Sequence, residues 1–374
     1  MSNSRGKLSI ISLKGGEEFI NSVNYYLKQW RGDEEDVETY VVKPDWPRFG
    51  TGEAKCVLHD SFRGHDVYII ADCFNYGATY KMYGMEVPMS PDDHFADLKR
   101  LICAIMGKAD HITVIMPMLY EGRQHKRSSR ESLDCAVALQ ELIDMGVNNI
   151  LTFDAHDARV QNAIPRFGFD NVHPTYQMIK SLVKHYPDIS FNKNDLMIIS
   201  PDEGGMSRCM YYSSVLGLDL GMFYKRRNYS VIVDGRNPIE AHEYLGRSVK
   251  NKDIIVVDDM ISSGESMFEV AKHLKERGAR RIFIFVSFGL FCNGVEKFNQ
   301  MYKDGIFDRV FTTNLTYRSD EVKNCEWYVE VNMCKYVALL IDSINHDESI
   351  SPLITPMDRI KRLLEKLPPE HRNF

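Results

Sequence analysis

The sequence predicts an α/β fold with a doubly wound, mostly parallel sheet, and three observations lead to this prediction. Short runs rich in Ile, Val and Phe alternate with longer helical stretches along the chain of 374 residues. The short runs show little polar alternation, as expected for parallel strands that helices cover on both faces. Helical stretches end in glycines such as Gly146 and Gly278, and glycine is the usual left-handed residue after a helix.

Seven apolar runs are expected to form buried strands. They are VYIIAD (67–72), ITVIMPM (112–118), NILTFD (149–154), LMIISPD (196–202), LGMFYKR (220–226), DIIVVDDM (253–260) and IFIFVSFG (282–289). Between them lie four predicted helices, and a short amphipathic helix is expected near the end of the chain. The helices are HFADLKRLICAIMG (94–107), SLDCAVALQELIDMG (132–146), SRCMYYSSVLG (207–217), SMFEVAKHLKERG (266–278) and DRIKRLLEKL (358–367).

The layout of the chain suggests a duplicated α/β domain. A strand, a loop, a helix and a further strand follow one another at 112–157 and again at 253–289. A polar, irregular stretch near residues 172–190 indicates the boundary between the two copies. We therefore expect one domain over residues 1–172, a second over 173–345 and a C-terminal extension over 346–374.

Composition and charge exclude several classes of function. Lys and Arg number 46 against 52 Asp and Glu, so the formal net charge is −6. A mildly acidic chain argues against non-specific binding of nucleic acid, which needs clustered positive charge. No stretch approaches the roughly 20 apolar residues of a membrane span, and MSNSRGKLSI lacks the apolar core of a signal peptide. We expect a cytoplasmic protein, and the eight cysteines, which include no CxxC pair, are expected to be structural thiols.

In an open parallel sheet, ligands bind beyond the carboxyl ends of the strands, so the residues that follow each run are the candidates. The sharpest pattern is IIVVDDMISSGESMFEVAKHL (254–274), in which Asp258 and Asp259 end a strand and a Ser-Ser-Gly-Glu-Ser loop leads into a helix. Backbone N–H groups at such a helix start suit a phosphate, and the carboxylates suit sugar hydroxyls. The pattern predicts a sugar-phosphate site; an Asp pair that merely caps a helix is the alternative.

Two further strand ends carry oxygen and imidazole groups. Asp154, His156 and Asp157 follow one strand, and Asp202 with a Gly pair follows another in SPDEGG (200–205). Hard oxygen ligands with at most one imidazole suit Mg²⁺, which usually bridges substrate phosphates. We expect a magnesium site here, with a purely structural histidine as the alternative.

Two basic clusters also follow apolar runs, at EGRQHKRSSR (121–130) and YKRRNYS (224–230). A charge run is usually a solvated surface. At strand ends, however, Arg and Lys neutralise polyphosphates, which is the main catalytic device of phosphoryl transfer. The absence of a GxxxxGK[ST] loop excludes a P-loop enzyme, and no GxSxG or HExxH motif occurs.

VVDDMISSGES (256–266) resembles the phosphoribosyl-diphosphate binding loop of the type I phosphoribosyltransferase fold. Six motifs in the family's order, within about residues 8–345, are similar to those of ribose-phosphate pyrophosphokinases. The other five are FGTGEAKCVLHDSFRGHDVYII (49–70), YEGRQHKRSSRES (120–132), LTFDAHDARVQN (151–162), SPDEGG (200–205) and YKRR (224–227). The resemblance implies two tandem type I phosphoribosyltransferase-like domains, each a mostly parallel sheet flanked by helices. It also implies transfer of the diphosphoryl group of Mg-ATP to the 1-hydroxyl of ribose 5-phosphate, which gives phosphoribosyl diphosphate and AMP.

The resemblance further implies which residues bind ATP. Phe49 and Glu53 would line the adenine pocket, with Thr51 where the family usually has Asn, and Arg123 and Gln124 would contact the nucleotide. Members of the family assemble as dimers and larger rings in which neighbouring subunits complete the ATP sites. A homo-oligomer is therefore expected.

The remaining implied roles concern the metal, catalysis and the sugar phosphate. His156 and Asp202 would hold Mg²⁺ with Asp154 as a possible outer ligand, and Lys225 and Arg227 would form the catalytic pair of a mobile loop. The ribose 5-phosphate site would use two carboxylates for the hydroxyls and the following loop for the 5-phosphate. These residues are Asp258, Asp259, Ser262, Ser263, Gly264, Glu265 and Ser266.

The chain also departs from the family pattern. His125 stands where Asp is common, Ser262 removes a carboxylate, and Glu265 replaces a Gly. The 73–93 stretch is longer than in the common form, and the tail extends beyond it. We expect a divergent synthetase, with a non-catalytic regulatory homologue as the alternative. A phosphoribosyltransferase acting on a base has no counterpart of the ATP segment, and a Rossmann redox enzyme is disfavoured because GxGxxG is missing.

Overall fold

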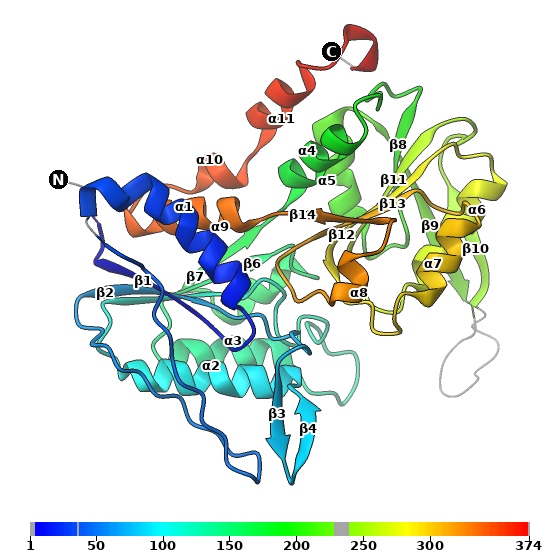
Figure 1. Ribbon diagram of the computed structural model, residues 1–374. Coiled ribbons are helices and arrows are strands. Elements are labelled where there is room, and N and C mark those ends of the chain that lie inside the picture. The colour runs from blue at the N-terminus through cyan, green and yellow to red at the C-terminus, as the bar shows by residue number, and fades with distance from the viewer. Residues whose placement is uncertain (1–3, 36, 228–238, 373–374) are drawn as a thin grey trace. The chain divides into compact units, whose positions relative to one another are not determined.

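The computed structural model describes residues 4–35, 37–227 and 239–372, and it describes no side chains at 33–35, 225–227 and 239–242. The chain folds into two compact units, each with its own sheet (Figure 1). The first unit comprises Met1–Pro174, Asn314–Ser319 and Asn332–Thr355, and the second comprises Thr175–Thr313, Asp320–Val331 and Pro356–Phe374.

The sheet of the first unit contains five parallel strands within the described ranges. Their order is β1 (Lys7–Ser12), β2 (His65–Ile70), β5 (His111–Ile115), β6 (Asn149–Phe153) and β7 (Gly168–Val172). The three runs predicted for this part of the chain form β2, β5 and β6, which are the central strands. The pattern does not predict β1 or β7, because both are edge strands whose sequences, KLSIIS and GFDNV, mix polar with apolar residues.

Helices cover both faces of this sheet, as a doubly wound fold requires. α2 (Pro91–Ile105) and α3 (Asp134–Asp144) pack on one face, and α1 (Glu17–Glu35) and α9 (Cys334–Asn345) pack on the other (Figure 1). α2 begins at a capping box in which Ser90 and Asp93 bond each other's backbone N–H groups, so the helix starts before the predicted residue 94. Within the described ranges, no helix is both long enough and apolar enough to cross a bilayer.

The aromatic, glycine-rich stretch at 73–93 contains an antiparallel hairpin of β3 (Thr79–Met82) and β4 (Met85–Pro88). Its two turn residues, Tyr83 and Gly84, have φ of 49° and 80°, the positive values that a tight hairpin turn requires. The short helices η1 (Ala158–Ala163) and α10 (Ser351–Ile354) also belong to the first unit.

The second unit has a seven-stranded sheet among its described residues, and only the pairing of β10 with β9 is antiparallel. The order is β10 (Ile239–Leu245), β9 (Asp219–Arg227), β8 (Leu196–Ser200), β11 (Asp253–Ile261), β12 (Ile282–Gly289), β13 (Arg309–Thr313) and β14 (Tyr328–Val331). The four predicted strands of this region are β8, β9, β11 and β12. α6 (Glu265–Glu276) and α7 (Glu296–Lys303) cover one face, and α4 (Thr175–His185) and α5 (Met206–Leu216) cover the other (Figure 1). Three short helices complete its described elements: α8 (Asp320–Lys323), α11 (Met357–Leu364) and η2 (Pro369–His371).

The compact units differ from the expected domain limits in the last part of the chain. α9 packs on α1 in the first unit, whereas the sequence analysis assigns residues 173–345 to the second domain. α11 packs on α4 in the second unit, although the tail 346–374 is expected to form an extension. The expected limits rest on order along the chain, and that order does not reveal which unit a late helix packs on.

Candidate active site

At the carboxyl edge of the second sheet, carboxylates lie in the last part of β11 and just after its neighbour β8. β11 pairs in parallel with β8 up to Val256, and Asp258 and Asp259 lie in the last part of β11, beyond this pairing. Asp202 follows the end of β8, and its Oδ1 accepts a hydrogen bond from the backbone N–H of Gly205 at 3.2 Å. The parallel register thus brings three of the predicted site residues to one edge.

Asp258 has the most perturbed environment of these carboxylates. Burial raises the pKa of the Asp258 carboxyl well above its ordinary range, and the nearby carboxylates of Asp259 and Asp202 raise it further. The guanidinium of Arg208 opposes this shift, with Nη1 3.6 Å from Asp258 Oδ1. Negative charge therefore exceeds positive charge here, which suits hydroxyl donors or a cation.

Arg208 is a residue that the sequence analysis missed. It lies in the first turn of α5, directly after the SPDEGG loop, and its side chain is only 10% exposed. Its place at the start of a helix that follows a strand end is the signal that could have revealed it, because such positions also lie at the carboxyl edge of the sheet.

The loop after β11 is shaped by Gly264, the N-cap of α6. Gly264 has a φ of 87°, and a Cβ on it would lie 2.4 Å from Cζ of Phe298. The carbonyl of Ser262 accepts the N–H of Cys292 at 2.9 Å, which fixes the loop from the opposite side. The N-cap Gly264 offers no side chain to cap α6, and the Glu265 N–H donates to the Ser263 hydroxyl at 3.5 Å. The role of this loop and helix start as an anion cradle for a phosphate stays a prediction.

Glu265 does not leave an unbalanced negative charge at this cradle. Lys297 at the start of α7 donates to both oxygens of the Glu265 carboxylate, at 2.6 and 2.5 Å. Both side chains are more than half exposed, so the pair adds little to stability. The ammonium group of Lys297 offsets the negative charge of Glu265, the residue that replaces a Gly of the family pattern in this loop.

The predicted catalytic pair lies at the end of β9. In backbone register, Lys225 faces His242 and Arg227 faces Ile239 across the antiparallel pairing with β10. The side chains of Lys225 and Arg227 lie outside the described part of the structure, as do residues 228–230 of the predicted basic cluster. Their catalytic role stays a prediction.

In the first unit, Asp154 follows β6 in a constrained position. It is buried, it has a φ of 46°, and its N–H donates to the carbonyl of Val172 at 2.8 Å. Its Oδ1 lies 3.4 Å from Nδ1 of His173 on the neighbouring segment. A non-glycine residue with positive φ at a strand end is a feature that recurs at functional sites, but the buried carboxylate is directed at His173.

His156, which also follows β6 in the first unit, forms a cluster with His125 and Asp157. The rings of His125 and His156 lie 5.3 Å apart, and His125 Nε2 is 3.4 Å from Asp157 Oδ2. Hydrogen bonds from Arg159 hold the pKa of Asp157 at about 2, whereas burial lowers the pKa of His125. Burial thus favours the neutral form of the His125 imidazole, whereas the hydrogen bonds from Arg159 favour the ionised form of the Asp157 carboxylate. Within the described residues, no group of three or more His, Cys, Asp or Glu side chains is placed to hold a metal ion by itself.

The predicted nucleotide residues lie on two turns of the first unit. Phe49 and Glu53 close one turn, in which the Phe49 N–H donates to the Glu53 carbonyl at 2.8 Å and the Thr51 hydroxyl donates to the Glu53 carboxylate at 2.9 Å. Arg123 and Gln124 lie in the other turn, where the Gln124 N–H donates to the carbonyl of Glu121. All five side chains are exposed, so both turns present them to solvent.

Comparisons with protein families match two consecutive regions of the chain. Residues 8–146 match the N-terminal domain of ribose phosphate pyrophosphokinase, and residues 170–314 match the phosphoribosyl transferase domain. The matches leave the last part of the chain, including α9 and α11, outside both regions.

Individual relatives and one solved structure agree with these matches. The chain is 31% identical over 304 residues to a ribose-phosphate pyrophosphokinase of Ureaplasma parvum, covering 80% of this chain and 81% of the relative. It is 27% identical over 310 residues to that of Vibrio cholerae, covering 82% and 89%. The crystal structure of phosphoribosylpyrophosphate synthetase from Mycobacterium smegmatis has a TM-score of 0.72 at 20% identity, covering 91% of this chain and 99% of that one.

Proposed function

The chain belongs to the ribose-phosphate pyrophosphokinase family, and we propose that it transfers the diphosphoryl group of Mg-ATP to the 1-hydroxyl of ribose 5-phosphate. The observation that carries this proposal is the edge formed by the end of β11 and the start of α6. Asp258 and Asp259 offer acceptors for vicinal hydroxyls, and the positive end of the α6 dipole, at the loop that Gly264 closes, favours the 5-phosphate. The products are 5-phosphoribosyl 1-diphosphate, a precursor for nucleotide biosynthesis, and AMP.

We propose that ATP binds to the first unit through its two exposed turns. The Phe49 ring is 57% exposed, and an exposed aromatic ring is suited to stack on adenine. The Glu53 carboxylate is oriented by the Thr51 hydroxyl, so it can accept a hydrogen bond from the base. Arg123 and Gln124 lie beside the His125–His156 cluster in sequence, and an Arg there would bind the triphosphate.

Magnesium fits the chemistry of the donors at these strand ends. We propose His156 in the first unit and Asp202 in the second as ligands of Mg²⁺, with Asp154 in an outer role because its buried carboxylate lies against His173 of the same unit. The crowding of Asp202 with Asp258 and Asp259 favours a cation. Mg²⁺ commonly takes only one or two protein ligands and completes its shell with substrate phosphates and water. When bound, the ion neutralises charge on the phosphates.

The proposed reaction is an in-line displacement at the β-phosphorus of ATP. The 1-hydroxyl oxygen of ribose 5-phosphate forms a bond to the β-phosphorus, the bond to the oxygen that bridges the α- and β-phosphorus breaks, and AMP leaves. The hydroxyl proton passes to solvent. Asp258 and Asp259 orient the sugar, while Lys225 and Arg227 stabilise the charge that develops on the transferred group.

The decisive assay measures AMP formed from ATP and Mg²⁺ with and without ribose 5-phosphate. AMP that depends on the sugar phosphate supports the proposal. No turnover together with tight binding to an active synthetase would instead favour a regulatory homologue. Sedimentation of the same preparation tests whether the chain forms a homo-oligomer.

A further inference from the structure

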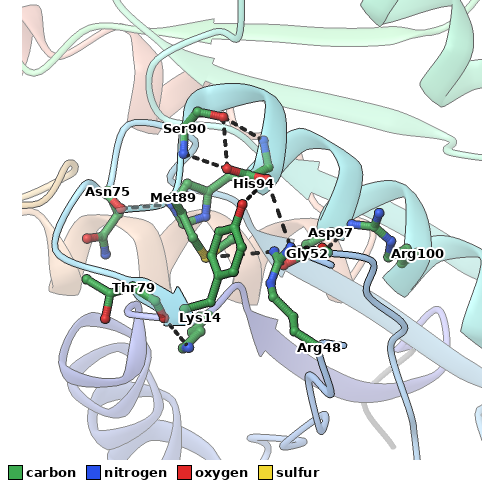
Figure 2. Close-up of polar contacts among 12 residues, drawn as sticks. Lys14, Arg48, Gly52, Asn75, Thr79, Met89, Ser90, His94, Asp97 and Arg100 are labelled. Carbon is green, nitrogen blue, oxygen red and sulfur yellow. Dashed lines mark hydrogen bonds and ion pairs between the residues drawn. The ribbon is translucent and has the colours of Figure 1, made fainter. Parts of the chain in front are cut away.

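Arg48 is a buried cation of the first unit whose guanidinium joins three segments (Figure 2). Its side chain is only 7% exposed, and Nη2 donates to Oδ2 of Asp97 on α2 at 2.7 Å. Nη1 donates to the carbonyl of Gly52 at 3.3 Å, and Cζ lies 4.2 Å from the centre of the Tyr80 ring on β3. One side chain thus ties the turn that contains Gly52 to a helix and to the hairpin.

The turn that Arg48 holds is the one that carries the exposed nucleotide residues. Arg48 and Ala54 form an antiparallel bridge at its base, and Phe49 bonds the Glu53 backbone within it. The backbone of this turn is therefore closed by its own hydrogen bonds. The side chains of Phe49 and Glu53 are exposed to solvent.

The hairpin of β3 and β4 closes on the turn from a second side. The N–H of Tyr83 donates to the carbonyl of Gly50 at 2.8 Å. A Cβ on Gly52, whose φ is 96°, would lie 2.9 Å from Sδ of Met82, so the hairpin and the turn are in direct contact. The Tyr80 hydroxyl bonds Oδ1 of Asp93 at 3.3 Å, which anchors the hairpin to the first turn of α2.

We propose that Arg48 is a positioning residue for nucleotide binding, and that the β3–β4 hairpin helps to hold the same turn in place. Arg48 fixes the turn that presents Phe49 and Glu53, so the conformational entropy of this turn is lost on folding and not on ligand binding. The proposal rests on the proposed function for the identity of the ligand, ATP. It also gives a role to the 73–93 stretch, which the sequence analysis left unexplained.

The geometry requires arginine at this position. A planar guanidinium can bond Asp97 and a backbone carbonyl in its plane while its face lies against the Tyr80 ring, whereas an ammonium group has no such face. Asp97 also accepts a hydrogen bond from Arg100 at 2.7 Å. Replacing Arg48 therefore leaves the buried Asp97 with a cationic partner, which favours a folded variant.

The test compares Arg48→Lys with Arg63→Lys, the same change at an exposed position of the first unit. Equilibrium binding of ATP with Mg²⁺, the KM values for both substrates and hydrogen exchange at residues 45–57 are measured on the full chain. Arg48→Lys is expected to weaken ATP binding and to raise the KM for ATP about tenfold. It should leave the KM for ribose 5-phosphate within about twofold and speed exchange at 45–57, and Arg63→Lys should match the parent.

A second variant guards against misfolding of the first. Tyr80→Leu keeps the Arg48–Asp97 pair and removes the ring together with its hydroxyl's hydrogen bond to Asp93, so it is expected to weaken ATP binding about threefold. Unchanged ATP affinity in both variants overturns the proposal, and so does faster exchange at 45–57 without loss of affinity. A parent chain that binds no ATP overturns it as well. A parent that binds ATP but forms no AMP refutes the proposed function, while lost affinity in Arg48→Lys would still support the positioning role.

Discussion

Replacing Gly264 by alanine is expected to destabilise the second unit and to weaken the binding of ribose 5-phosphate. The left-handed conformation at φ 87° costs an alanine about 1–2 kcal/mol. The new Cβ would also lie 2.4 Å from Cζ of Phe298 and 3.1 Å from Cζ of Phe268. Overpacking of this kind costs about 1–3 kcal/mol, because rings or backbone must move. The two costs together predict a loss of about 2–5 kcal/mol in the free energy of unfolding.

Gly305→Ala is the matched control for this prediction. Gly305 also has positive φ, 69°, but nothing lies within 4 Å of a Cβ placed there, so only the conformational cost of about 1–2 kcal/mol applies. Urea unfolding can be followed by tryptophan fluorescence, because the ring of Trp327 stacks on Phe298 with 5.1 Å between the ring centroids. The KM for ribose 5-phosphate should rise about tenfold or more in Gly264→Ala alone. Equal destabilisation of the two variants would refute the role of Phe298, and an unchanged KM would refute the anion cradle.

Three further outcomes are expected. Lys225→Ala should lower kcat about a hundredfold or more with a much smaller change in KM, because a transition-state contact is lost; steady-state kinetics check this. Asp253→Asn should lower the free energy of unfolding by about 3 kcal/mol in urea titrations, because the fully buried carboxylate is shared by Arg280 and Arg281. Burial raises the pKa of Asp72 to about 6, so the stability that Asp72 contributes is greatest below about pH 4 and is lost as the pH rises through 6. The stability of Asp72→Asn relative to the parent should therefore improve between pH 4 and 7, on the order of 2 kcal/mol in a pH series of urea midpoints.

The fold could be predicted because the central strands of both sheets are apolar on two faces. The family matches and the solved relative confirm two phosphoribosyltransferase-type α/β domains with mostly parallel sheets. The edge strands β7 and β14 were not predicted because their sequences, GFDNV and YVEV, mix polar with apolar residues. The interior strand β13 was not predicted because its sequence, RVFTT, has only two apolar residues. α9 was not predicted, although its sequence, CKYVALLIDSIN, is about as amphipathic as that of the predicted α2.

The candidate site could be predicted only where its residues are contiguous in sequence. Asp258, Asp259 and the loop before α6 form one stretch, and a strand followed by a helix start is recognisable without any tertiary contact. The ion pair of Arg48 with Asp97 joins residues 49 apart, and that of Lys297 with Glu265 joins residues 32 apart. Charge and periodicity do not specify such partners, because an arginine in a loop looks the same whether it is solvated or buried.

Asp258→Asn is expected to stabilise the ligand-free chain and to weaken its binding of ribose 5-phosphate. Burial, Asp259 and Asp202 all disfavour the ionised carboxylate, and the attraction of Arg208 at 3.6 Å offsets only part of that cost, since the pKa of Asp258 stays raised. An amide of the same shape removes the repulsion. It also removes the strong acceptor that a sugar hydroxyl would use, so stability and binding should change in opposite directions.

The pH dependence of the Asp258→Asn variant tests this reasoning. Because the folded pKa of Asp258 lies above the unfolded value, the stability it contributes is complete at low pH and is lost as the pH rises through the folded pKa. The variant should therefore gain on the parent between pH 4 and 8 in thermal midpoints. Asp253→Asn should show the opposite trend in a lower range: burial raises the pKa of Asp253, but the hydrogen bonds from Arg280 and Arg281 lower it overall, so this variant should lose on the parent as the pH rises from about 2 to 5 and change little above that. If both variants instead lose stability in parallel as the pH rises, Asp258 is a satisfied ion-pair partner, and the edge it occupies is not poised to receive sugar hydroxyls.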